Sequence, residues 1–225
     1  MKHSKGEAVR TVLAVIFNAA IFAVTAVCVL GFFVRGGSGN MTVVGAVAFR
    51  YFTVDSNVLV AVASLFVAVF GIVKLATGRE CPEWVRVLKF VGTVAVMMTF
   101  LTVVVFLGHV YGYKAMFVGT NLFMHLLTPL AALFTLWFAE YGVKIRPAFF
   151  ALGVAPTLLY GAVYLWMVIF AEKWGDFYHL SNGGKWWISV TLMIVGTAVI
   201  AVVTGLLANL ITRVHNSRLL RMPRK

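Results

Sequence analysis

The chain has 225 residues, of which 62% are hydrophobic and only 12% are charged, and its formal net charge is +12. So little polar surface excludes a water-soluble globular domain of this length. The basic residues lie in loops and tails rather than on one face. We therefore interpret them as topology determinants and contacts to anionic membrane lipid, and we predict no nucleic-acid partner.

Six apolar segments follow one another along the chain, each long enough for the roughly 20 residues that a membrane span needs. The predicted spans cover residues 11–33, 47–73, 88–108, 116–138, 148–170 and 186–211. A glycine-rich loop at 35–40 separates the first two, as expected of a turn. The predicted fold class is all-α: residues 1–225 form a single six-helix transmembrane domain, a multi-pass protein of the cell membrane.

The distribution of basic residues predicts the orientation of this domain. Fourteen of the 19 Lys and Arg residues fall in the two tails and in the second and fourth connections, when Lys89 is counted with the second connection. An excess of positive charge marks the cytoplasmic side, so both termini are predicted to be cytoplasmic. Cys28 falls deep in the first span and Cys81 in a cytoplasmic loop, so no disulfide is expected between them.

Polar side chains recur at helical spacing in four of the predicted spans. The second span carries Thr53 and Asn57, the third Thr99, Thr102 and His109, the fourth Asn121, His125 and Thr128, and the fifth Tyr160 and Tyr164. Residues at i, i+4 and i+7 share one helix face, so these stripes predict a central cavity or a hydrogen-bonded core in the outer half of the bundle. Helix packing alone accounts for any single threonine, because small hydroxyl residues commonly line helix contacts in membranes.

Two ionisable residues inside the spans stand apart from the threonines. Asp55 and His125 are costly to bury in a membrane and are therefore candidates for a functional site. Asp55 lies two residues from Thr53, which turns it roughly 200° away on the helix. We expect it to meet another helix near His109 or a tyrosine hydroxyl. Near the surface, Tyr178 and His179 are expected to be interfacial anchors.

These residues suit one kind of chemistry. A threonine hydroxyl is a weak nucleophile that needs an adjacent base, and His125 on a facing helix can supply it for Thr53. Asn57, Asn121 or a tyrosine hydroxyl can stabilise the developing oxyanion. Apolar helix walls favour an ester of a long acyl chain that enters from membrane lipid. No close set of His, Cys and carboxylate residues indicates a metal, and no cofactor is predicted.

Two motifs strengthen this interpretation by resemblance. The run Tyr51-Phe52-Thr53-Val54-Asp55-Ser56-Asn57, followed later by His125-Leu126-Leu127-Thr128-Pro129, resembles the Y-F-T-x-x-S-N and H-x-x-x-P patterns of a prokaryotic six-helix membrane family. That family is similar to the androgen-induced and androgen-dependent membrane hydrolases, which cleave fatty-acid esters of hydroxy fatty acids. The resemblance implies an intramembrane threonine hydrolase with Thr53 as nucleophile and His125 as base. The residues expected to bind substrate or support this pair are Asp55, Asn57, Asn121, Thr128, Tyr160, Tyr164 and His109.

Two alternatives use the same residues differently. A non-enzymatic carrier or receptor for a small amphiphile would need the same cavity, although the sequence lacks the internal repeat and the paired broken helices typical of transporters. A haem or quinone site would use His109 and His125, which requires both side chains at similar depth on facing helices.

Overall fold

The computed structural model describes residues 5–34, 45–140 and 142–221, so the expected loop at 35–40 lies outside the described residues. Within these ranges, six helices are long and apolar enough to cross a membrane. They cover Gly6–Val34, Phe52–Thr77, Glu83–Tyr111, Thr120–Phe138, Pro147–Phe170 and Trp186–Ser217. The prediction of an all-helical, multi-pass membrane protein is thereby confirmed at the level of helix number and length.

Several of these spans consist of more than one helical segment. The α-helical elements are α1 (Lys5–Val34), α2 (Phe52–Thr77), α3 (Glu83–Thr102), α4 (Gly108–Tyr111), α5 (Tyr113–Met116), α6 (Thr120–Leu122), α7 (Thr128–Phe138), α8 (Ala155–Leu165) and α9 (Trp186–Arg221). Between them lie 3-10 helices η1 (Gly45–Arg50), η4 (Pro147–Val154) and η6 (Asn182–Gly184), and π-helical turns η2 (Val103–Leu107), η3 (Phe123–Leu127) and η5 (Trp166–Phe170).

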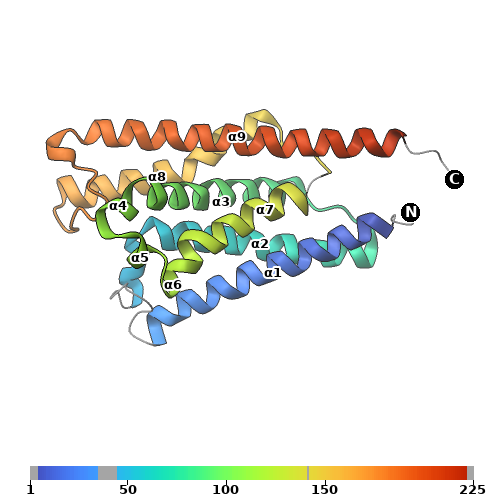
Figure 1. Ribbon diagram of the computed structural model, residues 1–225, viewed down its shortest axis with the longest axis horizontal. Coiled ribbons are helices and arrows are strands. Elements are labelled where there is room, and N and C mark those ends of the chain that lie inside the picture. The colour runs from blue at the N-terminus through green and yellow to red at the C-terminus, as the bar shows by residue number, and fades with distance from the viewer. Residues whose placement is uncertain (1–4, 35–44, 141, 222–225) are drawn as a thin grey trace.

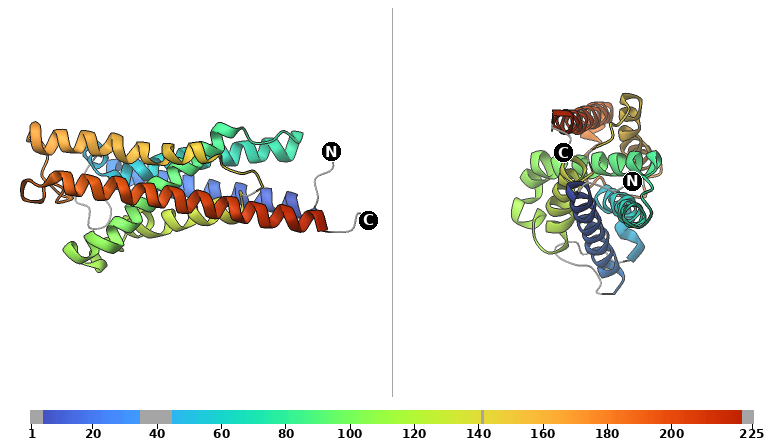
Figure 2. Two further views of the ribbon diagram at one scale, coloured as in Figure 1. Left: turned by 90° about the horizontal axis from the view of Figure 1, so that it is seen from above. Right: turned by 90° about the vertical axis from the view of Figure 1, so that its right-hand side faces the viewer.

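The helices form an elongated bundle with α3 near its centre (Figure 1). Helix α2 packs against α1 and α3, whereas α9 packs against η4, α3 and α7. The start of α1 and the end of α9 lie at the same end of the bundle in all views (Figures 1 and 2). An even number of crossings requires this arrangement.

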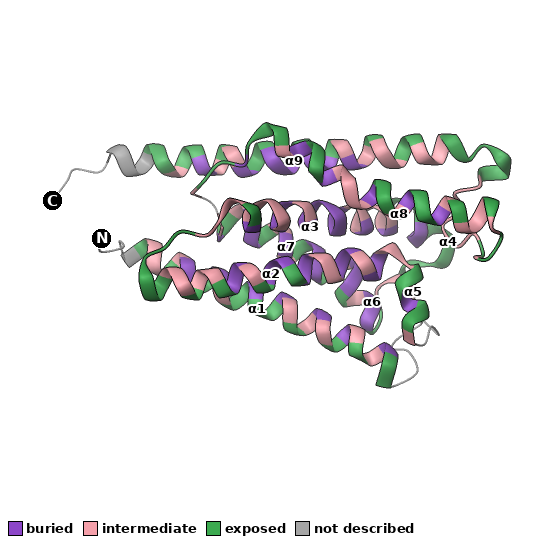
Figure 3. Cartoon of the chain, turned by 180° about the vertical axis from the view of Figure 1, so that it is seen from behind, coloured by how far each residue is buried: buried purple, intermediate pink, exposed green. Residues whose placement is uncertain are grey.

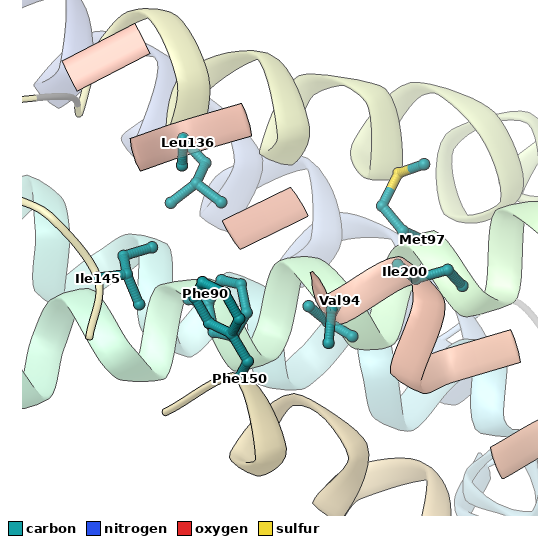
Figure 4. Packing of buried hydrophobic residues seen from close by; sticks show 9 residues of the cluster. Phe90, Val94, Met97, Leu136, Ile145, Phe150 and Ile200 are labelled. Atoms are coloured by element: carbon teal, nitrogen blue, oxygen red, sulfur yellow. The ribbon is translucent and has the colours of Figure 1, made fainter. Parts of the chain in front are cut away.

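The main hydrophobic core lies where α3, η4, α7 and α9 meet (Figure 4). Phe90 and Phe150 pack there with ring centroids 5.7 Å apart. A second close contact joins α2 to α3 at Gly92, where an added Cβ would lie 2.9 Å from the Val60 Cα atom. Glycine at this position therefore allows the two backbones to approach, as small residues do between membrane helices.

Large apolar side chains cover the outside of the bundle. Val27, Val105, Leu159 and Leu192 are each about 70% exposed, and exposed residues follow the outer faces of the helices (Figure 3). A soluble protein rarely exposes so large an apolar area. This surface is the one that lipid chains cover in a membrane.

Candidate functional site

Thr53 and His125 meet inside the bundle. The Thr53 Oγ1 atom lies 3.4 Å from the His125 Nε2 atom, and both side chains are buried. Thr53 belongs to the first turn of α2, and His125 comes from the π-helical turn η3 that precedes α7. The structure thus brings together the two residues that the motifs predict to form a pair. The separation exceeds that of a strong hydrogen bond, which is common for catalytic pairs without substrate.

A backbone carbonyl fixes the orientation of the His125 ring. The Nδ1 atom lies 2.8 Å from the Met116 carbonyl oxygen, at the end of α5. A carbonyl oxygen only accepts hydrogen bonds, so a neutral imidazole carries its proton on Nδ1. The Nε2 lone pair is then free to face the Thr53 hydroxyl. This is the tautomer that a general base needs.

The helix around His125 departs from α-helical geometry because of Pro129. A proline at this position has no N–H to donate to the carbonyl of residue 125, so the regular i to i−4 ladder is interrupted. The chain responds with the π-helical turn η3. Such turns recur at functional sites because they re-aim a side chain. The spacing between the histidine and the proline in the motif therefore has a geometric consequence.

Two buried asparagines brace this turn. The Asn57 amide nitrogen donates to the Thr53 carbonyl at 2.7 Å and to the Met124 carbonyl at 2.9 Å, which ties α2 to η3. The Asn121 amide nitrogen donates to the Ala115 carbonyl at 3.1 Å. Both side-chain amides thus donate hydrogen bonds to backbone carbonyl oxygens. The two N–H donors of Asn57 are both taken up by these carbonyls, whereas Asn121 uses one of its two.

Thr53 lies on the wall of a cavity of about 640 Å³, hereafter the Thr53 cavity. Most of its lining is apolar and comes from α3, η2 and α9. Its polar groups include Thr53, Thr99, Thr102, Tyr160, Tyr178 and His179. His125 is not among the residues that line the cavity. The volume falls within the roughly 300–1,000 Å³ typical of small-molecule sites.

Tyr178 is a site residue that sequence reasoning missed. Its hydroxyl lies at the start of α2, where it interacts with the Thr53 side chain and with the backbone amides of Phe52 and Thr53. Burial raises the pKa of Tyr178 to about 12, although these hydrogen bonds act to lower it. The phenol is therefore a hydrogen-bond donor at neutral pH. Tyr178 and His179, both expected to be interfacial anchors, border the cavity.

The loop that carries Tyr178 is ordered by Asp176. Its carboxylate accepts hydrogen bonds from the Leu180 and Ser181 amides, each at 2.8 Å, and from the Tyr164 hydroxyl at 2.9 Å. The Tyr164 oxygen in turn accepts a hydrogen bond from the Tyr178 amide at 3.0 Å. Tyr164 is fully buried and supports the loop without bordering the Thr53 cavity. The conformation of such a loop cannot be predicted from the helical spacing of residues in the sequence.

The remaining predicted residues divide into near and distant groups. Tyr160 borders the Thr53 cavity and donates to the Arg50 carbonyl at 2.6 Å. Thr128 is buried on α7 but does not reach the cavity. His109 is exposed and contacts the Tyr113 hydroxyl at 3.2 Å, so it is not part of the site. Because His109 is exposed while His125 is buried, the two do not form the facing pair that haem needs.

Asp55 faces away from Thr53, toward a second cavity of about 300 Å³, hereafter the Asp55 cavity. Asp55 borders this cavity together with Tyr160 of α8, and no hydrogen bond or ion pair to its carboxylate occurs among the described residues. The cavity lies between α2 and α8. Phe52 and Tyr160 border both cavities and separate them.

A second buried polar cluster centres on Lys89, in the half of the bundle that contains both chain ends. Its Nζ atom lies 2.7 Å from Asn18 Oδ1, 2.8 Å from Ser64 Oγ and 3.7 Å from Glu140 Oε1. The Lys89 side chain is fully buried. Its assignment to a cytoplasmic loop is therefore wrong, because α3 begins at Glu83 and carries Lys89 into the bundle. Helices α1, α2 and α3 and the segment that follows α7 meet in this cluster.

No group of three His, Cys, Asp or Glu side chains suited to a metal ion occurs in residues 5–34, 45–140 and 142–221. Comparison with protein-family models, curated proteins and solved structures finds no match for the chain.

Proposed function

We propose that this chain is an intramembrane hydrolase of lipid esters, of the type that cleaves fatty-acid esters of hydroxy fatty acids. One observation carries the proposal: the Thr53 hydroxyl lies 3.4 Å from a histidine nitrogen whose opposite ring nitrogen is held at 2.8 Å from a backbone carbonyl. Nucleophile, base and orienting acceptor are the three parts of an activated hydroxyl. The resemblance of the two motifs to a family of membrane threonine hydrolases points to the same pair.

The reaction begins when the Thr53 oxygen attacks the ester carbonyl carbon and its proton passes to His125 Nε2. The carbonyl oxygen becomes an oxyanion, which the Tyr178 hydroxyl stabilises by donating a hydrogen bond. As the ester bond breaks, His125 returns the proton to the departing alkoxide, and the acyl group remains on Thr53. A water molecule, deprotonated by His125, then attacks this acyl group and releases the fatty acid with Thr53 regenerated.

The surroundings of the pair select a lipid substrate. The wall of the Thr53 cavity is largely aliphatic, with Leu101, Val105 and Leu192 among its residues. Val105 and Leu192 are also each 68% exposed on the outside of the bundle. An acyl chain can therefore reach the cavity from the lipid between α9 and the end of α3. In the cell membrane, with both termini cytoplasmic, the site lies in the outer half.

The test is turnover by purified protein in neutral maltoside micelles, measured as fatty acid released from a panel of long-chain acyl esters. We expect hydrolysis by the wild type and its loss in Thr53→Ala and His125→Ala. Thr197→Ala is the matched control, because this threonine is buried on α9 and bonds only its own helix, at the Met193 carbonyl. Full activity in Thr53→Ala contradicts the proposal, as does amphiphile binding without turnover of any ester.

A further inference from the structure

The Asp55 cavity combines one carboxylate with several aromatic rings. Its lining includes Asp55, Phe49, Phe52, Tyr160 and Trp174. The Phe52 and Tyr160 rings pack with centroids 5.1 Å apart, which fixes one wall. Aromatic faces carry negative electrostatic potential and attract cations, most strongly those of tryptophan. The carboxylate and the aromatic faces of this cavity thus favour a positively charged group.

The Asp55 carboxylate has no counter-ion of its own among the described residues. The nearest basic candidate along the chain is Arg50, but its guanidinium lies over the Trp174 ring at 5.7 Å and forms no ion pair with Asp55. A half-buried carboxylate at the edge of a membrane is costly unless a partner neutralises it. The first turn of α2 offers Asp55 the partial positive charge of the helix N-terminus, and a cation bound from outside the chain would add the full counter-charge.

The opening of the cavity indicates what kind of molecule carries that partner. Leu159 and Val163 line it from α8, and they are 71% and 53% exposed on the surface that faces lipid. Asp55 lies three residues into α2, so it is about 5 Å from the start of that helix along its axis. This is the depth at which lipid headgroups meet acyl chains. The occupant is therefore an amphiphile with its cationic group inward and its alkyl chain along α8.

We propose that the Asp55 cavity binds the ammonium group of an amphiphile, with Asp55 as its counter-ion and Trp174 as an aromatic wall. The ammonium group can belong to a membrane lipid headgroup or to a single-chain amine. An anionic or neutral headgroup gains nothing from this lining. The proposal does not depend on hydrolysis at Thr53, because it concerns binding in a separate cavity.

The experiment titrates purified protein in neutral maltoside micelles with decylammonium and, in parallel, with decanol, which has the same alkyl chain without charge. We expect saturable binding of decylammonium by calorimetry and none of decanol. Asp55→Asn is nearly isosteric and should weaken binding at least about tenfold, since a hydrogen bond to a charged group is lost. Trp174→Leu should weaken it by roughly two- to thirtyfold.

Glu172→Gln is the matched control, because this exposed carboxylate precedes Trp174 in the same loop and should not affect binding. A second experiment places the protein in nanodiscs of phosphatidylethanolamine or of a neutral glycolipid. Native mass spectrometry then measures how much of each lipid stays bound to the released protein. Selective retention of phosphatidylethanolamine that Asp55→Asn abolishes assigns the site to a headgroup. Binding of decylammonium alone assigns it to a free amine. The proposal is overturned if decylammonium and decanol bind with equal affinity and neither lipid is retained selectively. It is also overturned if Asp55→Asn binds decylammonium and retains phosphatidylethanolamine as the wild type does.

Discussion

Replacing Lys89 with methionine is expected to destabilise the bundle strongly, although Lys89 borders neither cavity. Its ammonium group is fully buried and has two short hydrogen bonds, to Asn18 and Ser64, besides its ion pair with Glu140. Methionine keeps the length and the apolar stem but leaves these acceptors unpaired. Removing one partner of a buried ion pair costs about 3–5 kcal/mol. We expect the lower end, about 3 kcal/mol, because Asn18 still donates to Glu140 at 2.8 Å.

Lys74 provides a matched control with similar contacts and a different environment. Its ammonium group lies 2.8 Å from both Glu7 and Glu80; the Lys74 side chain is 13% exposed, but the Glu7 and Glu80 side chains are 32% and 61% exposed. Ion pairs at the surface contribute about 1 kcal/mol or less. Lys74→Met should therefore cost much less than Lys89→Met. Adding Glu140→Gln to Lys89→Met should recover part of the loss, because the uncharged amide needs no counter-ion.

The assay is reversible unfolding in mixed maltoside and dodecyl sulfate micelles, followed by circular dichroism. The free energy of unfolding should fall in the order wild type, Lys74→Met, Lys89→Met with Glu140→Gln, then Lys89→Met. If Lys89→Met is as stable as the wild type, the cluster contributes no net stability and the reasoning from burial fails.

Three further predictions concern the outer loop and the connection before α3. Tyr178→Phe should lower kcat for ester hydrolysis by about 10²–10³, as loss of one oxyanion donor does, while the variant remains folded. Burial tends to raise the pKa of Asp176, but hydrogen bonds from Ser181, Tyr164 and Leu180 outweigh it and hold that pKa below its ordinary value. Its stabilisation is therefore present above pH of about 4 and lost as pH falls through the lowered pKa. The difference in melting temperature between wild type and Asp176→Asn should shrink over that range, and a constant difference would contradict the assignment. Burial raises the pKa of Cys81 to about 11, so iodoacetamide should alkylate it at pH 8 about a hundredfold more slowly than a free thiol. Equal rates would show that the thiol is exposed.

The six helices could be predicted from sequence because hydropathy depends on composition over a window of about 20 residues. The contact between Thr53 and His125 could also be predicted, because each lies on a polar stripe and the stripes must face the interior. Asn57 and Asn121 belong to the same stripes, and both are buried beside the pair. Their use as braces was not predictable, because it depends on which backbone carbonyls the π-helical turn leaves open.

Lys89 and Tyr178 show where sequence reasoning fails. A lysine six residues after the start of α3 looks like a loop charge, since only the packing of α1, α2 and the segment after α7 around it creates a polar site for its ammonium group. Tyr178 reaches Thr53 because Asp176 folds the loop back over the bundle. Both depend on long-range contacts, which hydropathy and helical periodicity do not encode.

The central claim is that Thr53 is a nucleophile activated by His125. The most direct measurement is labelling of the purified protein with a fluorophosphonate, followed by peptide mass spectrometry to locate the adduct. We expect one adduct on Thr53 in the wild type and in the control Thr197→Ala. We expect no adduct in Thr53→Ala or His125→Ala, with both variants remaining folded. An adduct on another residue, or undiminished labelling in His125→Ala, would contradict this claim.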